Sequence, residues 1–187
     1  MFQFKQHHDL TGLHAPFSPS QSSWLRYSDD KLLEVYANKQ AAEHGSRLHA
    51  WAKETIDLRI KQPRSNRTLS AYVNDAIGFE METEVVLFYS PRFFGTADAI
   101  SFRNNCLRIH DLKTGKTKAD IEQLMVYAAL FCLEYQIRPE KLEDIELRIY
   151  QNDEVLVHKP TNEDITHIMK IIIRFDNILE KRMSKEA

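Results

Sequence analysis

Cysteine is scarce in this sequence, and the scarcity excludes several classes of protein. Cys106 and Cys132 are the only two cysteines among 187 residues. Two cysteines are too few for a disulfide-stabilised scaffold or for a four-cysteine metal site. The sequence therefore indicates a protein of a reducing, intracellular environment.

The chain also lacks long apolar runs and any excess of positive charge. No apolar segment approaches the length that spans a membrane, and the first residues do not resemble a signal peptide, so we expect no membrane partner. The formal net charge is −2, which argues against a protein that is basic over its whole surface and binds nucleic acid by charge alone. Basic residues do cluster locally, within 59–67 and 113–118. An ordinary solvated surface is the alternative to DNA contact for each cluster, and for 59–67 the two are equal alternatives.

Hydrophobic periodicity predicts an α/β protein. Helical patterns cover 30–60, with a break near Gly45, and then start again at Thr68. A β-branched and aromatic run over 82–89 predicts a strand, and two more strands follow it directly. A helix after Thr117, one or two strands and a final helix complete the order. This order fits a mixed central β-sheet flanked by helices.

Two asparagines between two short apolar runs predict a β-hairpin. Asn tolerates a positive φ, so Asn104 and Asn105 suit a two-residue turn between antiparallel strands. With these two residues as the loop, Arg103 pairs with Cys106, and every later pair keeps the same index sum.

This register brings two carboxylates together. It sets Ile100 against Ile109 and Asp98 directly opposite Asp111, while Lys113 lies on the same face two residues further on. Like charges directly opposite each other destabilise a sheet, so the pair needs a compensating cation. A divalent ion with oxygen ligands, such as Mg²⁺ or Mn²⁺, supplies that charge, and a nearby lysine can orient a water or stabilise a phosphate. The set suits metal-assisted phosphodiester hydrolysis.

The order of these motifs resembles the PD-(D/E)XK nuclease superfamily, and within it the RecB-like and phage lambda-type exonuclease branch. The resemblance rests on Gly-x-x-Asp ending at Asp98, on Asp-x-Lys-Thr-Gly beginning at Asp111, and on Gln-x-x-x-Tyr from Gln123 to Tyr127. It implies a restriction-endonuclease-like core. It also implies a catalytic set, namely Asp98, Asp111, Lys113, Gln123 and Tyr127.

A histidine on the first long helix extends the resemblance. His49 follows Gly45 by four positions and shares a helix face with Ala52 and Ile56, so it points inward. A lone inward histidine is usually a core residue, but Gly-x-x-x-His before the sheet resembles the RecB-type metal ligand. The family often has an acidic residue four positions later, where this chain has Lys53. The metal ligands implied are His49, Asp98, Asp111 and the backbone carbonyl of Leu112, around Mg²⁺ or Mn²⁺.

Three further residues are weaker candidates. Lys116 and Lys118 lie where Thr117 is expected to cap a helix, and phosphate is favoured there by charge and by free backbone N–H groups. Glu84 begins a strand where related nucleases often carry an acidic residue, so it could support the metal ligands. A solvated glutamate at a strand end is an equal alternative. Since the opening Trp24 segment lacks the cysteine that binds an iron–sulfur cluster in many RecB-like relatives, no cluster is expected.

These inferences predict an irregular arm over 1–17 and a single nuclease-like domain over 18–187. The expected activity is metal-dependent DNA hydrolysis, by an exonuclease of phage or bacterial recombination or repair type in the cytoplasm of a bacterial or phage-infected cell. Its substrate would be linear duplex or single-stranded DNA, and a homo-oligomer or a recombination partner is compatible with the family. The alternative is a catalytically weak or inactive nuclease fold that binds nucleic acid or protein.

Overall fold

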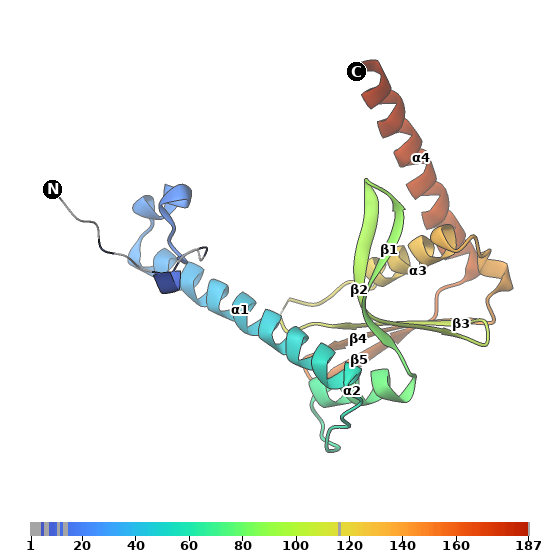
Figure 1. The fold of residues 1–187 in the computed structure, drawn as a ribbon, viewed down its shortest axis with the longest axis horizontal. Helices are drawn as coiled ribbons and strands as arrows, with labels where there is room; N and C mark the ends of the chain where they lie inside the picture. The colour runs from blue at the N-terminus through green and yellow to red at the C-terminus, as the bar shows by residue number, and fades with distance from the viewer. Residues whose placement is uncertain (1–4, 6–7, 11, 13–14, 116, 187) are drawn as a thin grey trace. The chain divides into compact units, whose positions relative to one another are not determined.

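The structure is a computed structural model of the 187-residue chain, and it describes residues 5, 8–10, 12, 15–115 and 117–186. The packing of the chain divides it into two compact units, Met1–Ser46 and Arg47–Ala187. The candidate site residues from His49 onward belong to the second unit (Figure 1).

The first unit is helical. Its elements are the short 3₁₀ helices η1 (His8–Leu10) and η2 (Pro19–Arg26), followed by the first half of α1 (Asp29–Asp57). The Phe17 ring lies 6.5 Å from Trp24 and 6.1 Å from Tyr36 between ring centroids. Three aromatic side chains thus supply much of the apolar packing described in this small unit. The 1–17 arm that the sequence predicts lies partly outside the described residues.

The predicted break near Gly45 is wrong, because α1 continues through this residue. One glycine inside a helix costs only about 1 kcal/mol relative to alanine. The backbone hydrogen bonds of a 29-residue helix can offset that cost.

The second unit is an α/β fold with a five-stranded sheet. Its strands are β1 (Glu82–Ser90), β2 (Phe93–Arg103), β3 (Cys106–Leu112), β4 (Asp144–Gln151) and β5 (Glu154–His158). Besides the end of α1, its helices are α2 (Thr68–Gly78), α3 (Glu122–Glu134), η3 (Pro139–Lys141) and α4 (Asn162–Glu186). The predicted α/β class with a mixed sheet flanked by helices is confirmed.

The strands follow one another across the sheet in the order β1-β2-β3-β4-β5. All neighbours are antiparallel except β3 and β4, which run parallel and are connected through α3. The Asn104-Asn105 turn is confirmed, since these residues have φ of 50° and 56°, and Arg103 pairs with Cys106. A second two-residue turn, at Asn152 and Asp153, joins β4 to β5.

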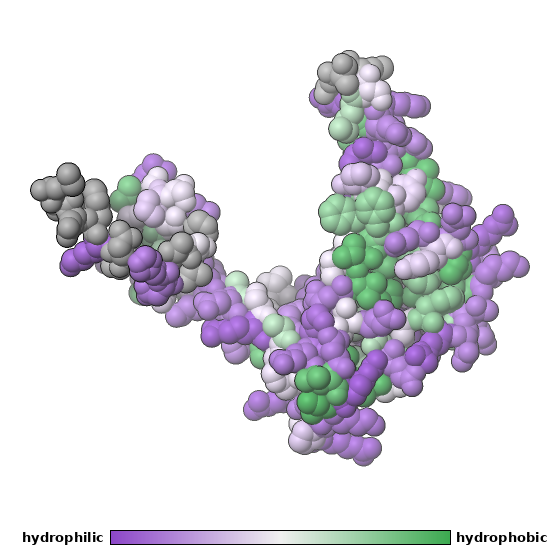
Figure 2. Space-filling model, in the orientation of Figure 1, coloured by the Kyte–Doolittle hydropathy of each residue, from purple (hydrophilic) through white to green (hydrophobic). Residues whose placement is uncertain are grey.

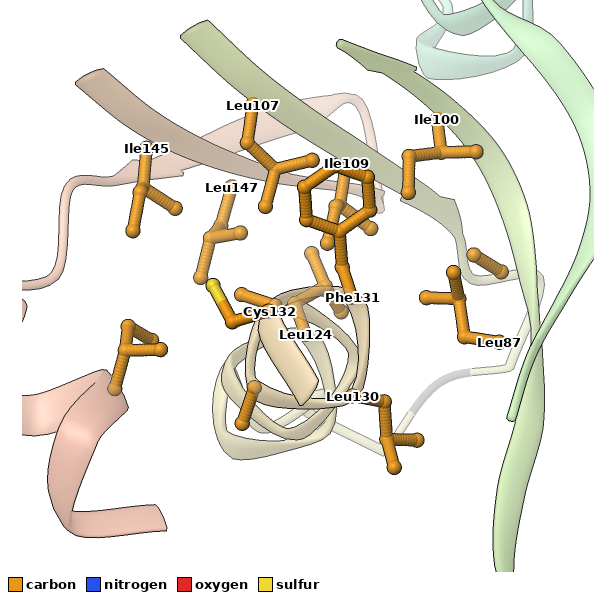
Figure 3. Close-up of a cluster of buried hydrophobic side chains, with 14 of the residues drawn as sticks. Leu87, Ile100, Leu107, Ile109, Leu124, Leu130, Phe131, Cys132, Ile145 and Leu147 are labelled. Atoms are coloured by element: carbon orange, nitrogen blue, oxygen red, sulfur yellow. The ribbon is translucent and has the colours of Figure 1, made fainter. Parts of the chain in front are cut away.

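Helices cover both faces of the sheet. On one face, side chains of β1 to β4 point toward α3, where Leu107 and Ile109 of β3 meet Leu124 and Phe131 (Figure 3). On the other face, α2 and the end of α1 pack over Ala99, Leu112 and Tyr150. Since successive residues of a strand alternate between these two layers, β3 contributes to both cores.

Some apolar side chains of the second unit are exposed. Figure 2 shows them gathered over α3 and the β1–β2 hairpin, where Phe88 and Phe94 are exposed. Phe175 and Ile178 of α4 are exposed too. No helix within the described residues is long and apolar enough to cross a membrane.

Candidate functional site

The site lies where β2 separates from β3. Their ladder ends with the pair Ala99 and His110, one step before Asp98 would face Asp111. If the β2–β3 ladder continued in the alternating antiparallel pattern, the next N–H of β3 to donate to a β2 carbonyl would be that of Leu112. This N–H instead donates to Oδ2 of Asp98 at 3.0 Å. The expected direct pairing of the two aspartates is therefore replaced by a side-chain contact that closes the end of the ladder.

Asp98 is held in an environment that disfavours its charge. Its Oδ2 lies 3.5 Å from Nδ1 of His49, which α1 presents from the second unit. Burial raises the pKa of Asp98 to about 6, and the negative charge of Asp111 acts in the same direction. The hydrogen bond from Leu112 and the charges of His49 and Lys113 oppose this rise. The two carboxylates therefore interact strongly, as the sequence predicts.

Asp111 is almost completely buried, with 3% of its surface exposed. Nζ of Lys113 lies 2.9 Å from both Oδ1 and Oδ2 and donates a hydrogen bond to Oδ1. Oδ2 accepts no hydrogen bond of good geometry from any described residue. Oδ2 therefore has the Lys113 ammonium as its counter-charge and keeps a lone pair that a cation could take.

Lys113 connects the strand to the next helix. Its backbone N–H donates to the carbonyl oxygen of Tyr150 at 2.9 Å, which fixes the chain just beyond β3. Its Nζ also donates to Oε1 of Gln123 at 2.9 Å, and Nε2 of Gln123 donates to the hydroxyl of Tyr127 at 3.3 Å. The predicted set thus forms one chain of contacts from Asp111 to Tyr127.

Tyr127 packs against the backbone of β2 at Gly95. A Cβ added to Gly95 would lie 2.8 Å from Cε1 of Tyr127, closer than real side chains approach. This glycine therefore makes room for the aromatic ring and explains why the Gly-x-x-Asp motif needs a residue without a side chain there.

Glu84 lies beside Asp98 in the β1–β2 register. Thr83 pairs with Ala99 and Val85 with Ala97, so Glu84 falls opposite Asp98 between these pairs. Its φ is 53°, an uncommon value for a residue with a side chain and one that stores backbone strain. Glu84 therefore lies opposite Asp98 along the sheet, with its side chain exposed.

Of the two candidate lysines, only Lys118 belongs to the described part of the chain. Lys116 lies outside the described residues. Lys118 is exposed on the segment between β3 and α3. The predicted helix cap at Thr117 is wrong, because α3 begins at Glu122 with Ile121 before it.

Gln151 explains the late start of α3, and sequence reasoning missed it. Its Nε2 donates to the carbonyl oxygens of Gly115 at 2.6 Å and Thr117 at 2.7 Å. Its Oε1 accepts from the N–H of Ala119 at 3.0 Å. These three bonds hold the segment in a non-helical path beside the end of β4. A glutamine at a strand end has no sequence pattern that signals this role.

Tyr72 is the second missed residue. It is buried on α2, and burial together with the charges of Asp98, Asp111 and Glu84 raises its pKa, so the phenol stays protonated. Three carboxylates are thus close enough to act on one buried phenol. Helical periodicity places Tyr72 on an apolar stripe and gives no sign of this surrounding.

The donor set suits a hard divalent cation, although the side chains alone do not complete a site. Two interacting carboxylates, one of them with a raised pKa, are the ligand type that Mg²⁺ and Mn²⁺ prefer. Among the described residues, no three His, Cys, Asp or Glu side chains converge as a metal-binding group. An ion here would therefore need backbone carbonyl and water ligands as well, as Mg²⁺ sites commonly have.

Fold and site together define an α/β domain with a buried aspartate, a half-buried aspartate and an adjacent lysine at the point where β2 separates from β3. Residues 65–162, more than half of the chain, match the family described as "Protein of unknown function (DUF2800)". The chain belongs to this family. Searches of the curated proteins and of the solved structures found no match.

Proposed function

We propose that this protein is a metal-dependent DNA nuclease with a PD-(D/E)XK-type, restriction-endonuclease-like core. The observation that carries the proposal is the pairing of Asp98 and Asp111, with Lys113 hydrogen-bonded to Asp111 and Gln123. Packing alone does not require two interacting carboxylates beside a lysine. Such arrangements raise the pKa of an acid and lower stability, so they are typical of functional sites.

The metal would be Mg²⁺ or Mn²⁺. Asp98, Asp111, the backbone carbonyl of Leu112 and His49 would hold it, with Glu84 beside them. When bound, such an ion supplies hydroxide near neutral pH and stabilises the leaving oxygen of the phosphodiester. It would also neutralise the repulsion between the two aspartates, for which the protein supplies a single nearby lysine.

Lys113 would act on the scissile phosphate and on the attacking water. Its ammonium group is held by Asp111 and Gln123, so it is already oriented before substrate arrives. There it would position the water and stabilise the negative charge that develops on phosphorus-bound oxygen. Gln123 and Tyr127 would keep Lys113 in place and orient the phosphate, and Lys116 and Lys118 would contact the DNA backbone.

Within this proposal the enzyme is an exonuclease of phage or bacterial recombination or repair type. It would act on linear duplex or single-stranded DNA in the cytoplasm of a bacterial or phage-infected cell.

A second candidate is an inactive nuclease fold that binds nucleic acid or protein. It is favoured by the absence of a three-residue metal-binding group among the described side chains and by the net charge of −2. The two candidates differ in whether a divalent ion leads to cleavage.

The test is digestion of end-labelled linear duplex, single-stranded and closed circular DNA with Mg²⁺, Mn²⁺ or EDTA. We expect metal-dependent loss of linear DNA and survival of circular DNA. Lys113→Ala should lower the cleavage rate by about 10²–10³-fold, the loss typical of removing one group that stabilises transition-state charge. Calorimetry should show that this variant still binds the metal.

Lys141→Ala is the matched control, because Lys141 is exposed in η3 on another part of the second unit. Its cleavage rate should equal that of the wild type. A folded protein that binds metal and cuts none of the three substrates would favour the binding module. Cleavage by Lys113→Ala at the wild-type rate would remove Lys113 from the mechanism.

A further inference from the structure

The strand β5 leaves one edge of the sheet without a partner. It pairs with β4 on one side, and no strand of the described chain pairs with its other side. Its three central residues are exposed on both faces of the sheet, with 41% of Val155, 47% of Leu156 and 48% of Val157 accessible. Natural proteins usually protect such an edge with lysine, proline or a covering element, because an exposed apolar edge strand attracts another strand. Neither lysine nor proline occurs within β5.

The sequence around this strand is complementary to itself. Residues 153–159 read Asp-Glu-Val-Leu-Val-His-Lys, with two acidic residues before the apolar centre and two basic ones after it. If a second copy pairs antiparallel with Leu156 opposite Leu156, each Glu154 faces His158. The acidic turn at Asp153 then meets the end of the other strand that carries Lys159. A parallel pairing would instead oppose like with like. Opposite charges across a strand pair stabilise it, and like charges destabilise it.

The backbone groups also suit this register. The two-residue turn at Asn152 makes Gln151 and Glu154 a hydrogen-bonded pair, so alternate residues of β5 direct their N–H and C=O groups to β4. Val155 and Val157 therefore direct theirs outward. In the antiparallel register centred on Leu156, Val155 of one copy lies opposite Val157 of the other, and these outward groups bond to each other.

One salt bridge and one hydrogen bond hold the ends of β5 and leave its outer edge open. Lys159 pairs with Asp144, and Asp153 accepts the N–H of Thr68 at 3.2 Å through Oδ1. Both contacts fix the ends of β5 within its own chain and leave the second oxygen of Asp153 for a partner. The partner strand would thus meet an edge whose two ends are already positioned.

We propose that two copies of this chain associate through their β5 edges. The two β5 strands pair antiparallel about a two-fold axis at Leu156 and join the two sheets into one sheet of ten strands. The occupant of the edge is a second copy, because the acidic-to-basic order of residues 153–159 matches its own reverse. This association is independent of nuclease activity. Its interface places the four valines on one face of the sheet and the two leucines on the other.

Disulfide trapping tests the register. Leu156→Cys, in the full chain with Cys106→Ser, places two thiols at a non-hydrogen-bonded pair, where Cα atoms lie about 4.5 Å apart and a disulfide can form. Cys132 can stay, because burial raises the pKa of its thiol to about 12 and keeps it unreactive. We expect mild oxidation to yield a covalent dimer within minutes at micromolar protein.

Val86→Cys in the same background is the matched control. Val86 is 54% exposed on β1, the opposite edge strand, so it reports random collision. We expect at least tenfold slower crosslinking there. Equal rates at the two positions would overturn the proposal, as would a sedimenting species that stays monomeric at every concentration tested.

A charge exchange tests the complementarity. Glu154→Lys places Lys opposite His158 and should weaken the dimer about tenfold in sedimentation velocity. Adding His158→Glu restores opposite charges and should restore the dimer. Failure of the double variant to recover, or a dimer insensitive to Glu154→Lys, would exclude this register. Circular dichroism confirms that each variant is folded, which is expected because these side chains lie at the surface.

Discussion

His110 and Asp111 are neighbours on β3, yet they enter two very different polar clusters on opposite faces of the sheet. On the His110 side, Arg148 pairs with Asp75 at 2.8 Å and with Glu146 at 3.0 Å. The hydroxyl of Tyr150 donates to the same Asp75 oxygen at 2.7 Å. Burial and the nearby arginines lower the pKa of His110 to about 3, so it stays neutral among paired charges. This cluster is balanced in charge.

The Asp111 side is not balanced. One lysine faces two carboxylates, one of which is almost completely buried. Glu84, opposite Asp98 along the sheet, adds backbone strain. Burial and repulsion raise the pKa of Asp98 instead of lowering it. The comparison indicates that the His110 cluster stabilises the fold. The Asp111 cluster costs stability, which is typical of a site that binds a ligand.

Arg148→Ala gives the largest effect expected on the fold. It leaves Asp75 without its cation and Glu146 with Arg108 alone. Since the pair is half-buried, the expected cost lies between the roughly 1 kcal/mol of an exposed pair and the roughly 3 kcal/mol of a buried one. Urea denaturation should show this loss, while the cleavage rate per folded molecule stays near that of the wild type. Lys113→Ala should differ in activity, because cleavage per folded molecule should be lost. It should also lower stability in EDTA, because it leaves the buried Asp111 without its cation.

Arg138→Ala is the control for this comparison, since Arg138 is exposed next to η3. Its free energy of unfolding should match that of the wild type. If Arg148→Ala abolished cleavage without loss of stability, the division of roles between the two clusters would be wrong.

Asp98→Asn sharpens the comparison through pH. The folded-state pKa of Asp98 is about 6, above the ordinary aspartate value of 3.8, so the folded protein holds this proton more tightly than the unfolded chain. The free energy of unfolding in EDTA should therefore decrease as pH rises from about 4 to 6, and stay lower above 6. Asp98→Asn should remove that decrease and should be more stable than wild type at pH 7.

Urea titrations at several pH values measure this effect, with the exposed Asp30→Asn as control. Adding Mg²⁺ at pH 7 should recover stability in wild type and not in Asp98→Asn. If the free energy of unfolding rose between pH 4 and 6 by the same amount in the wild type and in Asp98→Asn, the raised pKa would be contradicted.

Gly95→Ala gives the smallest effect of the three. The new methyl would press on the Tyr127 ring at 2.8 Å and shift the chain from Tyr127 through Gln123 to Lys113. We expect about a tenfold slower single-turnover cleavage, equivalent to about 1.4 kcal/mol. Tyr127→Phe keeps the ring and removes only the hydroxyl, so its loss should be smaller.

Gly78→Ala is the matched control, because nothing lies within 4 Å of the Cβ it would add. Its cleavage rate should not change. Equal losses at Gly78 and Gly95 would show that the effect is not transmitted through Tyr127.

The parts of the fold that the sequence predicted depend on neighbouring residues. The turn at Asn104 and Asn105 follows from the tolerance of Asn for positive φ, and the strand register follows from the turn. The contact of Lys113 with Asp111 follows from their spacing on one strand. Contacts between residues close in the sequence therefore allow prediction of the β2–β3 hairpin and of the contact between Lys113 and Asp111.

The parts it missed depend on residues far apart in the chain. Gln151 reaches the segment before α3 across 32 to 36 positions, and the surroundings of Tyr72 come from β1, β2 and β3. The end of the β2–β3 ladder depends on a side chain replacing a backbone acceptor at Leu112. Periodicity within a segment contains no information on such contacts.

The parallel pairing of β3 with β4 has a consequence for the time course of folding. The turns between β1, β2 and β3 let these strands pair between near neighbours, which is fast because little loop entropy is lost. β4 can join only after α3 has crossed over the sheet. Lys113 needs both β4 and α3 for its position, so we expect the candidate site to be assembled last and to open first when the protein begins to unfold.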